Sequence, residues 1–140
     1  MIKKIKNLEE LRAFAEELSL KIKKGTLIGL KGPLGAGKTT LVKYIGKALK
    51  VKEEIISPTF NIIKVYDSIL GPLYHIDAYR LENIDFDPTV DEYLYDEKAV
   101  RIVEWYEYLS DPIFNDAIKI EIKVEDNDDR TLFIEGMENV

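Results

Sequence analysis

The sequence predicts an α/β fold: a three-layer sandwich built on a mostly parallel sheet with antiparallel hairpin additions. Three patterns indicate this class. Residues 7–24 repeat apolar side chains at helical spacing. Residues 26–30 form a short apolar run typical of a buried strand, and a second helical pattern follows over 38–49. Residues 117–124 and 130–135 alternate apolar and charged side chains around an acidic turn, which favours a hairpin.

The first helix has recognisable ends. Asn7 is a good N-cap, and Glu10 follows three residues later as in a capping box. Lys23 and Lys24 place cations in the last turn, and Gly25 is a typical stop. The pattern therefore predicts a helix over residues 7–24.

The middle of the chain predicts shorter elements. Residues 60–66 and 73–77 are rich in strand-forming side chains, and the turn signal over 67–72 predicts that they form a hairpin. A short helix is expected near 90–95, and residues 100–103 form another apolar run that predicts a buried strand.

Composition limits the kind of protein. A length of 140 residues predicts one domain spanning 1–140. The chain has no cysteine, which excludes disulfides, thiolate catalysis and cysteine-based zinc sites. We see no signal peptide and no apolar run of membrane-spanning length, so we expect a cytoplasmic protein without membrane contact.

Charge is unevenly distributed along the chain. Residues 1–70 carry 14 Lys and Arg against 7 Asp and Glu, whereas residues 71–140 carry 6 against 19. An acidic half disfavours direct contact with nucleic-acid phosphates and suits a basic protein partner, although many of these acids serve only as solvated surface.

One glycine-rich segment carries phosphate chemistry. It reads Gly32-Pro33-Leu34-Gly35-Ala36-Gly37-Lys38-Thr39 and fits the Walker A pattern at every fixed position, with a predicted strand before it and a helix after it. Backbone N–H groups of such a loop cradle phosphates, Lys38 adds a point charge, and the Thr39 hydroxyl is a hard ligand for Mg²⁺. We expect a P-loop NTPase-like fold that binds a nucleoside triphosphate through Gly32, Leu34, Gly35, Ala36, Gly37, Lys38, Thr39 and Thr40.

A hydrolytic site also needs an acid at a strand end. Asp77 and Glu104 each follow four residues of a predicted strand, so either could bind Mg²⁺ while the other orients water. Thr59, within Ser57-Pro58-Thr59-Phe60, could reach the γ-phosphate as switch segments do, or could simply begin a strand.

Three further side chains have two interpretations each. His75 is the only histidine, and a lone histidine is more often structural or a hydrogen-bonding partner than a metal ligand. Trp105, the only tryptophan, could pack beside the nucleotide or in the core. Arg80 could neutralise phosphate charge or pair with the acidic half.

Together these segments resemble one family. The loop from Gly32 to Thr40, Ser57-Pro58-Thr59-Phe60, Leu73-Tyr74-His75-Ile76-Asp77-Ala78-Tyr79-Arg80 and Val103-Glu104-Trp105 look like the bacterial TsaE (YjeE) family, over about residues 7–110. TsaE is the small ATPase of tRNA threonylcarbamoyladenosine biosynthesis. One departure is Ala78, where the family pattern HxDLYR has leucine.

The resemblance implies both function and residue roles. It implies binding of ATP and ADP with Mg²⁺, and ATP hydrolysis that resets the TsaD–TsaB heterodimer between transfers of threonylcarbamoyl to adenosine 37 of tRNAs reading ANN codons. The protein would then meet tRNA only indirectly. By position, Lys38, Asp77, Glu104 and Thr59 would be catalytic, Thr39, Glu104 and Asp77 would serve Mg²⁺, and Trp105 would lie beside the nucleotide.

Three rival functions are open on the residues alone. A small P-loop kinase needs arginine-bearing lids, and the four arginines Arg12, Arg80, Arg101 and Arg130 are scattered. A GTPase would need the Asn-Lys-x-Asp guanine motif, which the sequence lacks. A non-catalytic nucleotide sensor would share the same loop as a slow ATPase.

Overall fold

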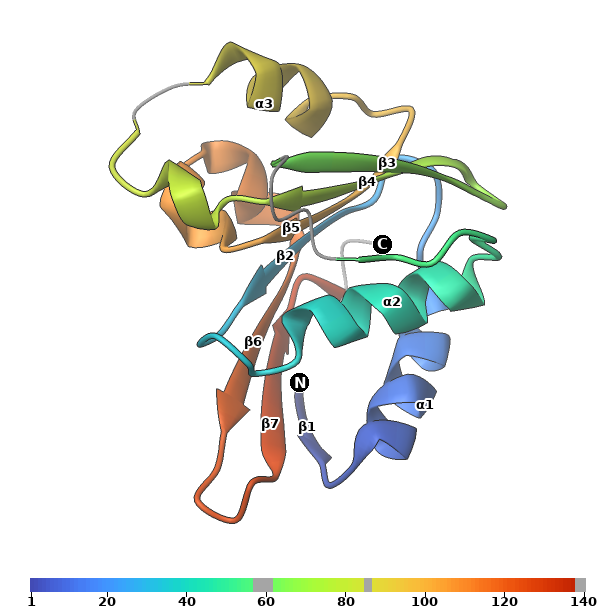
Figure 1. The fold of residues 1–140 in the computed structure, drawn as a ribbon, viewed down its shortest axis with the longest axis vertical. Helices are drawn as coiled ribbons and strands as arrows, with labels where there is room; N and C mark the ends of the chain where they lie inside the picture. The colour runs from blue at the N-terminus through green and yellow to red at the C-terminus, as the bar shows by residue number, and fades with distance from the viewer. Residues whose placement is uncertain (57–61, 85–86, 138–140) are drawn as a thin grey trace.

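The computed structural model describes residues 1–56, 62–84 and 87–137, which form one seven-stranded sheet with helices on both faces (Figure 1). Its elements in chain order are β1 (Ile2–Ile5), α1 (Leu8–Ser19), β2 (Leu27–Lys31), α2 (Lys38–Ala48), β3 (Ile63–Ser68), β4 (Gly71–Asp77), the 3₁₀ helix η1 (Tyr79–Leu81), α3 (Pro88–Leu94), β5 (Val100–Glu104), the 3₁₀ helices η2 (Tyr106–Leu109) and η3 (Pro112–Asp116), β6 (Ile118–Val124) and β7 (Arg130–Glu135).

The strand order is β1-β7-β6-β2-β5-β4-β3. The four central strands β6, β2, β5 and β4 run parallel to one another, while β7 and β1 on one side and β3 on the other pair antiparallel. The predicted fold class, a mostly parallel sheet with antiparallel hairpin additions, is therefore confirmed. In such sheets, ligands bind at the carboxyl ends of the parallel strands, which is where β2 runs into the glycine loop.

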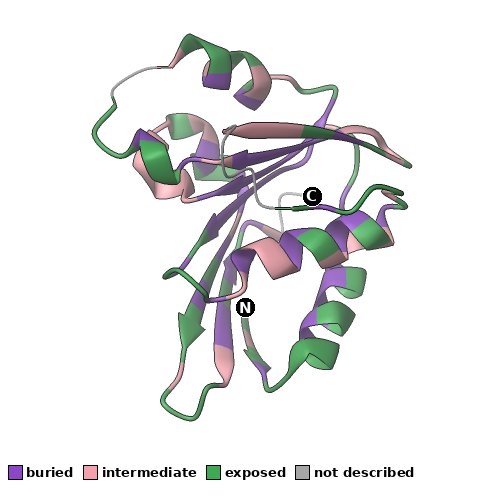
Figure 2. Cartoon of the chain, in the orientation of Figure 1, coloured by how far each residue is buried: buried purple, intermediate pink, exposed green. Residues whose placement is uncertain are grey.

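Each face of the sheet has its own apolar core. Helices α1 and α2 pack together on one face, whereas α3, η2 and η3 cover the other (Figure 1). The two middle strands, β2 and β5, are buried over nearly all of their residues because both faces are covered (Figure 2), which explains why they appear in the sequence as apolar runs. None of the helices in the described ranges is long and apolar enough to span a membrane.

Side-chain alternation places the candidate acids on the α2 face. In β4, Leu73 belongs to the core beneath α1 and α2, while Tyr74 and Ile76 pack on the opposite face. His75 and Asp77, which alternate in step with Leu73, therefore face α2. Because β4 and β5 pair in parallel register with Asp77 opposite Glu104, the two acids end neighbouring strands side by side.

One expectation about the first elements was wrong, and one strand was not predicted. The first helix ends at Ser19 rather than at residue 24. The Ser19 hydroxyl donates to the Ala15 carbonyl at 2.6 Å, and the next N–H groups bond three residues back, so the chain tightens into turns before Gly25. The strand β1 was not predicted, because only its two end residues are apolar and its pairing depends on β7 at the far end of the chain.

Candidate functional site

The glycine loop leads from β2 into α2 and approaches the sheet closely. Gly32 has a φ of 158°, and a Cβ there would lie 2.7 Å from the carbonyl oxygen of Ile122 on β6. Gly37 is the N-cap of α2 with a φ of 113°, and no side chain caps the helix. The first bond of the helix runs from Leu41 to Gly37, which leaves the preceding N–H groups without a helical partner. This helix end can bind an anion.

Lys38 is folded back onto its own loop. Its buried ammonium donates to the carbonyls of Gly32 and of Pro33, the latter at 2.9 Å, and lies 4.2 Å from the centre of the Trp105 ring. Burial lowers the pKa of Lys38, while the charges of Glu104 and other nearby acids oppose that shift. A phosphate at the loop would supply the anionic partner that these neutral groups replace.

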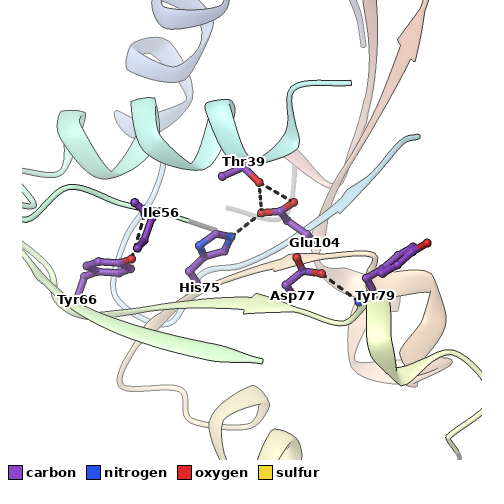
Figure 3. Close-up of polar contacts among 7 residues, drawn as sticks. All are labelled: Thr39, Ile56, Tyr66, His75, Asp77, Tyr79 and Glu104. Atoms are coloured by element: carbon purple, nitrogen blue, oxygen red, sulfur yellow. Dashed lines mark hydrogen bonds and ion pairs between the residues drawn. The ribbon is translucent and has the colours of Figure 1, made fainter. Parts of the chain in front are cut away.

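Thr39 and Glu104 are in direct contact. The Thr39 Oγ1 lies 2.9 Å from Oε2 and 3.1 Å from Oε1 of Glu104, so its hydroxyl can donate to the carboxylate (Figure 3). Glu104 is 3% exposed at the end of β5. The fold thus joins the loop hydroxyl to one of the two candidate acids across the α2–sheet interface.

His75 completes this cluster from β4. Its Nε2 lies 2.6 Å from Oε2 of Glu104, and its ring is fully buried (Figure 3). The sequence predicts that this lone histidine is structural or a hydrogen-bonding partner rather than a metal ligand, and the structure shows it hydrogen-bonded to Glu104. The two residues are 29 positions apart in the sequence, so no local pattern could predict their contact.

Asp77 lies beside Glu104 but is bonded differently. Its Oδ1 accepts the Tyr79 backbone N–H at 3.0 Å (Figure 3). Burial raises the pKa of Asp77, and the nearby Glu104 charge raises it further, while the Tyr79 hydrogen bond acts in the opposite direction. A carboxylate with a raised pKa is a stronger base than an ordinary aspartate.

Trp105 follows Glu104 with a left-handed backbone, φ 60° and ψ 37°. The Trp105 backbone N–H donates to the Leu30 carbonyl at 2.9 Å. Its ring stacks on Tyr108 at a centroid distance of 5.2 Å and tilts against Tyr79 at 5.0 Å. These contacts hold an unfavourable backbone conformation and keep the ring over the Lys38 ammonium. Ala78, the departure from the family pattern, is fully buried and donates its N–H to the Glu104 carbonyl.

A pocket of about 280 Å³ opens beside the loop, between α2 and the start of α1. Residues from three separate segments line it, among them Leu8, Leu11, Gly35, Ala36, Thr40 and Arg130. The Arg130 Nε donates to the Ala36 carbonyl at 3.0 Å, across 94 positions of sequence. Sequence patterns predicted only the loop side of this pocket, because no spacing rule links Arg130 to the loop.

The remaining predicted residues are less enclosed or are not described. Leu34 is 71% exposed at the tip of the loop. Thr59 lies outside the described residues. Arg80 is exposed in η1, whereas Arg101 is buried in β5 and donates to the carbonyls of Leu94 and Gly25.

The residues of the cluster fit Mg²⁺ by their chemistry. Thr39 and Glu104 offer hard oxygen atoms, the ligands that Mg²⁺ prefers. Within the described ranges, no three His, Asp or Glu side chains converge as a metal site of their own. A magnesium ion here would therefore take further oxygens from nucleotide phosphates and water, as is usual for this ion.

Comparison with known proteins decides the family. A family model described as threonylcarbamoyl adenosine biosynthesis protein TsaE matches residues 5–132. The chain belongs to the TsaE family. The tRNA threonylcarbamoyladenosine biosynthesis protein TsaE of Bacillus subtilis is 36% identical over 133 residues, covering 95% of this chain and 84% of that protein. TsaE of Aquifex aeolicus is 41% identical over 101 residues, 71% of each chain.

A solved structure agrees with this assignment. The crystal structure of Bacillus subtilis YdiB aligns with a TM-score of 0.77 at 32% identity, covering 94% of this chain and 82% of that one. The resemblance to TsaE drawn from the sequence is confirmed. Membership of the TsaE family places the chain in tRNA threonylcarbamoyladenosine biosynthesis, and the family together with the P-loop fold indicates a nucleotide-binding protein.

Proposed function

We propose that this TsaE-family protein binds ATP with Mg²⁺ and hydrolyses it in the cytoplasm, acting with a TsaD–TsaB heterodimer to reset that enzyme between threonylcarbamoyl transfers to adenosine 37 of tRNAs reading ANN codons. The observation that carries the hydrolytic part is the contact of Thr39 with Glu104, with Asp77 beside it. The reset role and the partner rest on the family.

The nucleotide would lie along the loop and the first turn of α2. The N–H groups before Leu41 face the phosphates, and the nucleoside enters the pocket formed by the loop, the start of α1 and Arg130. Lys38 exchanges the Gly32 and Pro33 carbonyls for phosphate oxygens. Because a charged partner replaces neutral carbonyls, this exchange favours the triphosphate-bound state.

Thr39 Oγ1 and the Glu104 carboxylate would hold Mg²⁺, exchanging their mutual hydrogen bond for shared coordination. When bound, Mg²⁺ neutralises charge on the phosphates and makes the terminal phosphorus more open to attack. ADP binds through the same loop and pocket after hydrolysis.

Asp77 would orient the attacking water. Its carboxylate sits on the α2 face next to Glu104 and carries a raised pKa from burial. The water oxygen bonds to the γ-phosphorus as one water proton passes to the Asp77 carboxylate and on to solvent, the bond from that phosphorus to the bridging oxygen breaks, and ADP and inorganic phosphate leave. Thr59, in the segment before β3, is proposed to face the γ-phosphate.

The partner would bind mainly through charge. Residues 71–140 carry the acidic excess, and α3 presents Asp91 and Glu92 on the sheet face opposite α1 and α2. A basic protein surface suits the acidic surface of residues 71–140 better than tRNA does, because its negative charge would repel tRNA phosphates.

Single-turnover ATP hydrolysis with and without the TsaD–TsaB heterodimer tests the proposal. We expect slow phosphate release by the protein alone and faster release with the heterodimer. If ATP binds but the heterodimer elicits no phosphate release, the protein is a nucleotide sensor that acts by binding alone. If phosphate passes to a small molecule instead of water, it is a kinase.

A further inference from the structure

We propose that His75 is a positioning residue that fixes the Glu104 carboxylate for magnesium. The proposal rests on the proposed function, in which Glu104 and Thr39 hold the ion. It assigns a task to the one histidine of the chain, which the hydrolytic scheme above does not use.

The geometry is that of a dedicated pair. His75 Nε2 and Glu104 Oε2 are 2.6 Å apart, and the two side chains are 0% and 3% exposed. His75 lies on β4 one alternation before Asp77, on the face of the sheet that α2 covers. The ring therefore reaches Glu104 from the neighbouring strand, while Thr39 reaches it from the helix (Figure 3).

Glu104 needs a second donor to hold one orientation. The last torsion angle of a glutamate side chain has a broad distribution, so the side chain itself does not fix the plane of its carboxylate. Thr39 has a single hydroxyl hydrogen, yet its oxygen is within 3.1 Å of both carboxylate oxygens. The Thr39 contact alone leaves the carboxylate free to rock between them. The bond from His75 to Oε2 distinguishes the two oxygens and leaves Oε1 for the ion.

The rest of the imidazole indicates that this bond is its purpose. Within the described part of the chain, the buried His75 Nδ1 has no hydrogen-bond partner. Leaving a buried nitrogen unpaired is unfavourable, and Leu73, the preceding residue of β4 on the same face of the sheet, is a fully buried apolar side chain. An apolar residue would fill this place at lower cost if packing were the only requirement.

A histidine also suits an ion-binding carboxylate better than a cation does. Imidazole can donate a hydrogen bond while neutral. It can thus orient Glu104 without cancelling the negative charge that attracts Mg²⁺, whereas a lysine or arginine would compete with the ion. Hydrogen-bonding partners behind metal ligands commonly change metal affinity by about ten- to a hundredfold.

The test measures magnesium rather than turnover. Isothermal titration gives the affinity for the non-hydrolysable analogue AMP-PNP over a series of Mg²⁺ concentrations, in the wild type, His75→Leu and His75→Gln. Mg²⁺ should strengthen AMP-PNP binding, and the midpoint is the Mg²⁺ concentration that gives half of this gain in affinity. We expect His75→Leu to raise this midpoint by about ten- to a hundredfold, with the affinity for AMP-PNP in the absence of Mg²⁺ unchanged. His75→Gln should stay near the wild type, because its amide nitrogen takes the place of Nε2.

Two outcomes would overturn the proposal for His75 and leave the proposed function standing. One is a Mg²⁺ midpoint in His75→Leu equal to that of the wild type, and the other is an equal rise of the midpoint in the leucine and glutamine variants. A wild type whose nucleotide affinity ignores Mg²⁺ would overturn the proposed function, and this proposal with it. Thermal unfolding checks that each variant is folded. Should His75→Leu not fold, His75→Asn replaces it, because its amide is too short to reach Glu104 and the same loss is expected.

Discussion

Replacing Gly32 by alanine should destabilise the protein far more than the same change at Gly35. At Gly32 the new Cβ would lie 2.7 Å from the Ile122 carbonyl oxygen, a backbone atom of β6 that cannot turn aside. Its φ of 158° adds strain for any residue with a Cβ. Backbone strain of about 1–3 kcal/mol and overpacking of about 1–3 kcal/mol together predict a loss of about 2–6 kcal/mol.

Gly35 is the matched control in the same loop. Its φ is 79°, so alanine is strained there too, but a Cβ would have nothing within 4 Å. The strain alone predicts a loss of about 1–2 kcal/mol.

Urea denaturation of both variants and the wild type gives the free energies of unfolding, provided that the slope with urea is the same in all three. Equal losses at Gly32 and Gly35 would refute the reasoning. They would mean that the close approach of the loop to β6 does not require glycine at Gly32, and that positive φ alone explains both.

Three other predictions concern the Trp105 ring beside Lys38, the hydrogen bond between Tyr74 and Asp96, and binding to the partner. Adding ATP with Mg²⁺, or ADP, should change the fluorescence of Trp105, because phosphate draws away the Lys38 ammonium that lies over its ring; an unchanged spectrum would contradict that placement. The Tyr74 hydroxyl lowers the pKa of Asp96, so this bond stabilises the fold above the ordinary aspartate pKa of about 3.9 and is lost as pH falls. Tyr74→Phe should therefore reduce stability at neutral pH, and its stability should decline less below about pH 4 than that of the wild type; parallel curves would show that the bond contributes nothing. Binding to TsaD–TsaB should weaken as salt is added, and a salt-independent affinity would rule out mainly electrostatic docking.

Local patterns predicted most of the fold. The apolar runs at β2 and β5, the alternating strands β6 and β7, and the helical stripe of α2 are each set by burial of neighbouring side chains, so their types could be predicted and their ends nearly so. The strand β1 could not be predicted because it owes its place to pairing with β7. The end of α1 was missed because the Ser19 side chain competes with the helix, and the later Lys-Lys-Gly signal hid this.

The site was predictable where chemistry follows spacing along the chain. The glycine loop and the acids that end β4 and β5 belong to that group. Glu104, which contacts Thr39, is the acid that we propose holds Mg²⁺. What could not be predicted depends on strand order and packing. The bond from His75 to Glu104 requires β4 beside β5, and the contact of Arg130 with the loop requires β7 near the start of α1.

The most direct test of the hydrolytic site compares the wild type with Glu104→Ala in single-turnover ATP hydrolysis, with ATP binding measured in parallel. The wild type should release phosphate, whereas Glu104→Ala should bind ATP through its intact loop and release none. Phosphate release by Glu104→Ala at the wild-type rate would contradict the assignment of Glu104 and Thr39 as the centre of an ATP-hydrolysing site.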